Sequence, residues 1–69
     1  MDDFCAKIAE ILETDTVCPE TEFRQVEYFD SLKGFCIIVM LERDYGKRIT
    51  VDEFMGCLTI ADLGRLVGV

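Results

Sequence analysis

The sequence contains no histidine among its 69 residues. Serine and cysteine nucleophiles are commonly activated by a neighbouring imidazole, and neither Ser31 nor any of the four cysteines can be activated in that way. Lysine and carboxylate bases remain, but the sequence shows no constellation that would place one of them beside a nucleophile. We therefore expect a protein that is not an enzyme.

Closely spaced metal ligands are also lacking. The cysteines stand at positions 5, 18, 36 and 57, and no two of them form a CxxC pair. Zinc sites usually bring their ligands in such pairs, and disulfides are typical of secreted chains. Nothing indicates secretion, because the first residues, with Asp2 and Asp3, lack the basic region of a signal peptide. We expect no metal and no disulfide, with all four thiols free.

The chain has no long hydrophobic run. Its most apolar stretch, residues 34–41, is far shorter than the roughly 20 residues that a membrane span requires. Hydrophobic residues still make up 51% of the sequence, which is enough to fill a small core and argues against disorder. We expect a single domain over residues 1–69, without a membrane span, located in the cytoplasm and monomeric when alone.

Basic residues are few, with 7 against 14 acidic ones, for a net charge of −7. Residues 1–31 hold nine acids and two bases, whereas residues 32–69 hold five of each, so the excess negative charge lies in the first part of the chain. A nucleic-acid-binding protein needs the opposite sign, so that class is disfavoured. The acidic balance fits either basic protein partners or a solvated acidic face with no partner.

Hydrophobic periodicity predicts an all-α fold, a small antiparallel bundle of three main helices and one short one. Residues 2–13 form an amphipathic helix that Asp2 or Asp3 can cap, and residues 14–29 form a long loop with a short helical turn at 19–22. The other helices are expected at 31–45, near 52–55 and from Thr59, its cap, to about Val67. Expected core residues outside the second helix are Phe4, Ile8, Ile11, Leu12, Val17, Phe23, Val26, Ile60, Leu63, Leu66 and Val67.

The stretch Asp30-Ser31-Leu32 opens the second helix. Asp30 is a suitable N-cap, because its carboxylate can accept a hydrogen bond from an unpaired N–H of the first turn. Ser31 then occupies the first helical position, where free N–H groups and the positive end of the helix dipole would stabilise an attached anion, a phosphate above all. Gly46 suits the left-handed residue that ends the helix.

The second helix is apolar on nearly every side. Ile37, Ile38, Leu41 and Tyr45 share one side and are expected in the core, so that some of Leu32, Cys36, Val39 and Met40 should be exposed. Gly34 lies one turn after Ser31 and disfavours the helix by roughly 1 kcal/mol relative to alanine. Two interpretations stay open: room for a prosthetic arm or a close partner, or simple tolerance of glycine near a helix start.

This register resembles the acyl carrier protein family. Its members carry Asp-Ser-Leu at the start of their second helix, followed by an apolar residue, an aromatic and an isoleucine ten, fourteen and eighteen positions after the serine. The corresponding positions here hold Leu41, Tyr45 and Ile49. The likeness covers nearly the whole chain, since Phe23 matches a loop phenylalanine and Thr59-Ile60 with Leu63 matches the start of the last helix.

The resemblance implies a function. A phosphopantetheinyl transferase would attach 4′-phosphopantetheine from coenzyme A to Ser31, which Asp30 and Leu32 flank. The arm would carry acyl intermediates as thioesters to acyl-transferring or condensing enzymes of a fatty-acid, polyketide or specialised lipid pathway. Part of the acyl chain could enter the interior between the second helix and its neighbours. An aminoacyl or peptidyl carrier, an unmodified carrier-like binding subunit and a plain helical interaction module are the alternatives.

The sequence also departs from the family. Glu27-Tyr28 replaces the Leu-Gly that many members have before the serine, and Lys33 and Cys36 replace the acids that fatty-acid carriers tend to have two and five residues after it. Glu42 does match an acidic position, although the basic Arg43 follows. A general fatty-acid-synthesis carrier is therefore disfavoured. We expect a largely apolar docking face for a dedicated partner, composed of Leu32, Lys33, Cys36, Val39, Met40 and Glu42.

Overall fold

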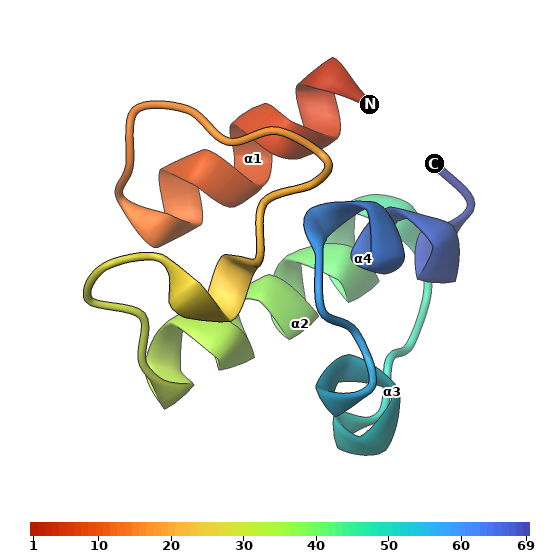
Figure 1. Ribbon diagram of the computed structural model, residues 1–69. Coiled ribbons are helices and arrows are strands. Elements are labelled where there is room, and N and C mark those ends of the chain that lie inside the picture. The colour runs from red at the N-terminus through yellow and green to blue at the C-terminus, as the bar shows by residue number, and fades with distance from the viewer.

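The computed structural model describes residues 1–69 as four α-helices and one short 3₁₀-helix, with no strand (Figure 1). In chain order these elements are α1 (Asp2–Leu12), η1 (Phe23–Gln25), α2 (Ser31–Tyr45), α3 (Val51–Met55) and α4 (Ile60–Val67). The prediction of an all-α bundle with three main helices, one short helix and a long first loop is confirmed. No helix is both long enough and apolar enough to cross a membrane.

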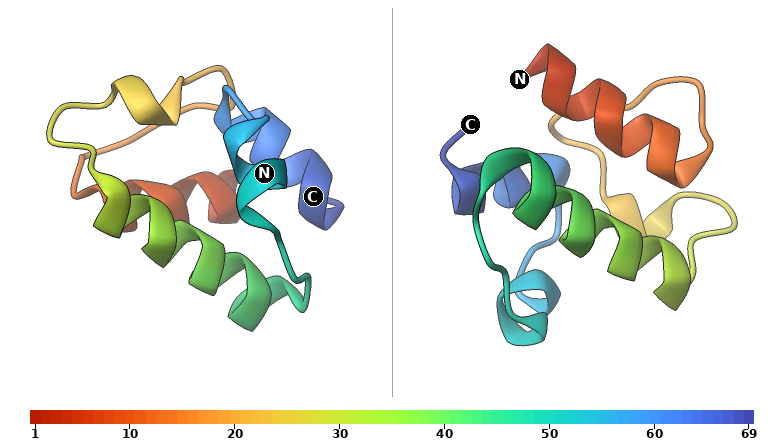
Figure 2. Two further views of the ribbon diagram at one scale, coloured as in Figure 1. Left: turned by 90° about the horizontal axis from the view of Figure 1, so that it is seen from below. Right: turned by 180° about the vertical axis from the view of Figure 1, so that it is seen from behind.

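The core lies between α1, α2 and α4. Helix α1 packs against both α2 and α4, and α3 lies apart from α1 at the far end of the molecule (Figures 1 and 2). The largest fully buried side chains come from every main helix and from η1: Phe4, Ile8, Leu12, Phe23, Ile37, Leu41, Ile60 and Leu63. No polar or charged residue is buried with them. The fold therefore rests on apolar packing of the helical stripes that the sequence predicts.

The loop from residue 13 to residue 30 is attached to the core by apolar packing and to α4 by hydrogen bonds. Phe23 is fully buried, while Val17 and Val26 pack against the core from its edge, as expected. The carbonyls of Pro19 and Thr21 accept hydrogen bonds from the backbone N–H groups of Ala61 and Ile60, at 2.9 and 3.1 Å. These N–H groups belong to the first turn of α4 and have no partner within their own helix, so the loop satisfies them.

Two local predictions in the first half of the chain are wrong. The helical segment of the loop is η1 rather than residues 19–22, where Pro19 and Glu20 form only a hydrogen-bonded turn. Neither Asp2 nor Asp3 caps α1: the N-cap is Met1 without a side-chain hydrogen bond, and both aspartates lie in the first turn. There the positive end of the helix dipole still stabilises their charge.

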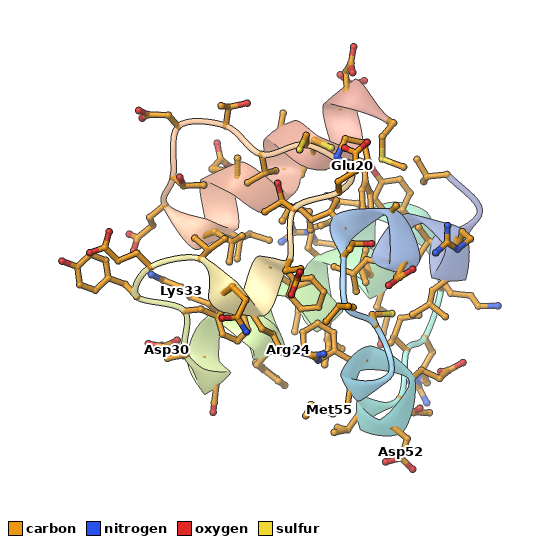
Figure 3. The ribbon with its side chains drawn as sticks, viewed as in Figure 1. Glu20, Arg24, Asp30, Lys33, Asp52 and Met55 are labelled. Atoms are coloured by element: carbon orange, nitrogen blue, oxygen red, sulfur yellow. The ribbon has the colours of Figure 1, made fainter.

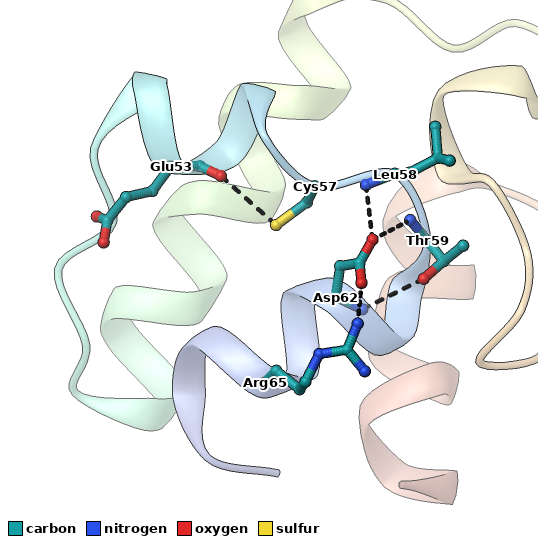
Figure 4. A network of polar contacts seen from close by, with 6 residues as sticks. All are labelled: Glu53, Cys57, Leu58, Thr59, Asp62 and Arg65. Atoms are coloured by element: carbon teal, nitrogen blue, oxygen red, sulfur yellow. Dashed lines mark hydrogen bonds and ion pairs between the residues drawn. The ribbon is translucent and has the colours of Figure 1, made fainter.

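Helices α3 and α4 each begin with a threonine that caps the first turn. Thr50 and Glu53 form a reciprocal capping box at α3, and Thr59 and Asp62 form another at α4. In the second box the Asp62 carboxylate accepts from the N–H groups of Leu58 and Thr59 at 2.9 and 3.1 Å, and it also pairs with Arg65 (Figure 4). These two hydrogen bonds are the main causes that lower the pKa of Asp62. They stabilise the anion relative to the acid.

Candidate functional site

Ser31 is the only serine in the chain, and it is exposed at the first position of the 15-residue helix α2. The predicted N-cap before it is present, since Asp30 accepts a hydrogen bond from the Lys33 N–H at 2.9 Å (Figure 3). The N–H groups of Ser31 and Leu32 donate to no acceptor within the protein. The Ser31 hydroxyl thus lies beside two free donors at the positive end of a helix dipole, where an anion is stabilised.

The residue three positions before Ser31 has an unusual backbone. Tyr28 adopts the left-handed conformation, with φ of +67°, and its ring is largely exposed. The Lys33 amino group donates to the Tyr28 carbonyl at 3.1 Å and also forms an ion pair with Glu13 at 3.3 Å. The Lys33 side chain is only 17% exposed as a result. Lys33 therefore holds the approach to Ser31 in place, and its membership of the docking face stays a prediction.

Helix α2 divides into a buried side and an exposed apolar side. Ile37 and Leu41 are buried as expected, while Ile38 and Tyr45 pack against the core from its edge. On the other side Leu32 is 70% exposed and Val39 is 42% exposed, and Cys36 between them is also exposed.

Met40 does not belong to the exposed side, because it is only 3% exposed and packs in the core. Its inclusion in the docking face is wrong. Phe35, a member of neither the predicted core nor the predicted docking face, is 62% exposed and takes that place. Its spacing of three from Leu32 and four from Val39 puts all three side chains on one helix face, and that spacing was the signal that could have found it.

A groove of about 500 Å³ runs between α2 and α3 beside Ser31. Its volume lies within the range of about 300–1,000 Å³ typical of small-molecule sites. Asp30 and Ser31 stand at the α2 end, and Arg24 comes from η1. The remaining lining residues are glycine or apolar, and they are Phe29, Gly34, Phe35, Ile38, Val51, Phe54 and Met55.

Arg24 fixes the position of α3 next to this groove. Its guanidinium donates to the Cys57 carbonyl at 2.6 Å and to the carbonyls of Phe54 and Met55 at 3.4 Å each (Figure 3). The Phe54 and Met55 carbonyls belong to the last residues of α3, and the Cys57 carbonyl lies just beyond its end, where a cation is favourable. The short helix is thus tied by one side chain to the loop that precedes Ser31.

The charges around α2 are mostly paired. Glu42 is exposed and lies 3.8 Å from Arg48, and Arg43 lies 3.0 Å from Asp44. The hydrogen bond from Arg43 is the main cause that lowers the pKa of Asp44. The face around Leu32, Phe35 and Val39 is therefore mainly apolar, with Glu42 as its acidic member.

All four cysteines are free thiols. Cys18 and Cys36 are exposed, whereas Cys5 and Cys57 are buried, and burial raises the pKa of both buried thiols. No group of three histidine, cysteine or acidic side chains is arranged to hold a metal ion.

Comparison with known families gives a match to the phosphopantetheine attachment site over residues 2–67, nearly the whole chain. The chain therefore belongs to this family, whose domain is the site of covalent 4′-phosphopantetheine attachment in acyl carrier proteins. Such domains are carriers, and the catalysis is done by other proteins. A search of curated proteins gave no match. An exposed hydroxyl, two free N–H donors and an adjoining apolar groove fit a prosthetic arm that begins with a phosphate.

Proposed function

We propose that Ser31 is the residue that bears 4′-phosphopantetheine and that the protein is an acyl carrier of a fatty-acid, polyketide or specialised lipid pathway. The observation that carries this proposal is the place of the chain's only serine, exposed at the head of α2 immediately after the Asp30 cap. The terminal thiol of the arm supplies the thioester linkage to the acyl group.

A phosphopantetheinyl transferase would be the first partner. The Ser31 oxygen forms a new bond to the phosphorus that carries the pantetheine in coenzyme A, and the bond from that phosphorus to the adenosine bisphosphate group breaks. The hydroxyl proton passes to a base on the transferase, because the chain has no histidine and the neighbouring Asp30 Oδ1 already accepts from the Lys33 N–H. The protein's own part is to present the hydroxyl and to stabilise the attached phosphate with the N–H groups of Ser31 and Leu32.

The acyl-transferring or condensing partners would dock on the exposed side of α2. Leu32, Phe35, Cys36 and Val39 compose its apolar part, and Glu42 adds one acidic group. Association on such a face depends mainly on desolvation of apolar surface, so its affinity should change little with salt. Partners that recognise an acidic helix would instead lose affinity as salt screens the charges.

Intact mass tests the attachment site directly. Incubation with coenzyme A and a broad-specificity transferase should add roughly 340 Da to the protein, the mass of the arm's covalent formula. Ser31→Ala should abolish this gain and keep the helical circular dichroism spectrum. Thr16→Ala, which removes an exposed hydroxyl from the loop, should be modified like the original protein. Mass gain in Ser31→Ala would refute the site, and no gain in the unmutated protein would favour the unmodified binding subunit.

A further inference from the structure

Gly34 forms the floor of the groove beside Ser31, and two aromatic rings close over it. A methyl group built at Gly34 would lie 3.4 Å from Phe29 Cζ and 3.4 Å from Phe54 Cε2. These rings come from the loop before α2 and from α3, so they meet on α2 from opposite neighbours. Both rings therefore lie against α2 at Gly34, at ordinary van der Waals distance from the place of an added methyl group.

Behind this pair lies a third ring that is part of the core. Phe23 is fully buried, with its ring centroid 5.3 Å from that of Phe54 and 6.1 Å from that of Phe29. Aromatic pairs at these separations attract one another beyond the effect of burial alone. The Arg24 hydrogen bonds to the carbonyls at the end of α3 hold Phe54 against the cluster. The three rings therefore form a wall between the groove and the interior.

The interior behind the wall is filled. Ile37, Leu41, Ile60 and Leu63 are each fully buried, and all belong to one continuous apolar cluster. The groove in front of the wall has apolar sides that face solvent instead, since Val51 is 66% exposed and Met55 is 59% exposed. Exposed apolar side chains in a concave surface next to the attachment residue are stabilised when a ligand covers them.

We propose that Phe29 and Phe54 set the cargo specificity of this carrier: they exclude the acyl group from the core and confine it to the groove between α2 and α3. This inference rests on the proposed attachment at Ser31. The groove takes a short apolar acyl group, and the outer part of a longer chain remains in solvent or in the partner enzyme. Among the cargo classes considered above, this disfavours long saturated fatty acyl chains that need shelter inside the carrier.

The experiment loads the protein with acyl-phosphopantetheine from butanoyl-, octanoyl- and dodecanoyl-coenzyme A and confirms each product by intact mass. Methyl NMR then shows where the acyl group lies, and thermal unfolding gives Tm. We expect shifts at the methyls of Val51, Met55 and Ile38, little change at those of Ile37 and Leu41, and no rise in Tm from octanoyl to dodecanoyl. A chain in the core would instead bury more methylene surface with each added carbon and raise Tm by several degrees.

Removing one ring tests the wall itself. Phe54→Ala should open space behind Gly34, so that octanoyl loading now shifts the Ile37 and Leu41 methyls and raises Tm relative to butanoyl loading. If the alanine variant does not fold, Phe54→Leu, which retains more of the packing, takes its place in the same test. Val51→Ala changes the outer side of the groove and leaves the three rings in place, so core methyls should stay unshifted in this control.

Two results would overturn the inference. Core methyl shifts together with a Tm that rises with chain length in the unmutated protein would show that the acyl group enters the interior despite the rings. Identical responses of the unmutated protein and both Phe54 variants would show that Phe54 does not exclude it. Failure of the proposed function looks different, because the loaded masses would then be absent from the start.

Discussion

The amino group of Lys33 donates a hydrogen bond to the backbone carbonyl of Tyr28 at 3.1 Å. Tyr28 has a φ of +67°, in the left-handed region that suits glycine. Residues with a side chain are disfavoured there by roughly 1–2 kcal/mol. Lys33, itself paired with Glu13, stabilises the strained turn and so sets the direction from which the chain enters α2.

Replacing Tyr28 should reveal this strain. Tyr28→Gly removes the ring and relieves the backbone, whereas Tyr28→Ala removes the ring and keeps the left-handed conformation. We expect the glycine variant to be more stable than the alanine variant by about 1 kcal/mol, less the extra entropy that glycine gains in the unfolded chain. Urea unfolding of the two variants measures the difference. An alanine variant as stable as the glycine variant would mean that the turn is not strained.

The adjacent residues Val39 and Met40 provide a matched pair on α2. Val39→Glu places a charge on the exposed side and should change the unfolding free energy by no more than about 1 kcal/mol. Met40→Glu buries an unpaired charge in the core and should destabilise the protein by several kcal/mol. Thermal unfolding separates the two effects.

The same pair tests docking on the apolar side of α2. The rate at which a condensing enzyme uses the loaded arm, measured at low protein concentration, should fall in the folded Val39→Glu variant, and the effect should persist at high salt because it is steric and apolar rather than ionic. A Tm that collapses in both variants would place Val39 in the core and contradict the docking face.

The cysteines should fall into two classes of reactivity. Cys18 and Cys36 are exposed and should react rapidly with a thiol reagent in the native protein. Cys5 and Cys57 should react slowly, because they are buried and burial raises their thiol pKa, which leaves less of the reactive thiolate. Cys36→Ser should leave one rapid thiol. Without reductant, all four thiols should titrate after unfolding, and a lower count would indicate a disulfide or a bound metal.

Acid should weaken the cap of α4 in a predictable direction. The pKa of Asp62 is lowered in the folded protein, so the folded state binds the proton less readily than the unfolded state does. Its stabilising effect is therefore complete at neutral pH and is lost as the pH falls below about 4, the usual range of an aspartate. Asp62→Asn should lower the free energy of unfolding at pH 7, and this difference from the original protein should become smaller as the pH falls. Urea unfolding at pH 7 and at about pH 3 measures it. A difference that stays constant would contradict this role.

Local sequence determined where the helices begin and end. Asp30, Thr59 and Gly46 act as predicted because a cap is a contact between a side chain or one backbone conformation and N–H or C=O groups three or four residues away. The place of Ser31 at the head of α2 follows directly from the Asp30 cap. The expectation that Asp2 or Asp3 caps α1 was wrong, because Met1 is the N-cap and both aspartates lie inside the first turn.

Tertiary structure decided how the residues around Ser31 are used. The choice of Phe35 over Met40 for the exposed side of α2 depends on where α1 packs against that helix, and the nearly uniform apolar pattern of α2 does not encode this. Lys33 is engaged because Glu13, twenty residues earlier in the sequence, comes from the end of α1, and no local pattern predicts this contact. Phe29 and Phe54 meet on Gly34 from two other segments, and contacts between distant segments exist only once the chain has folded.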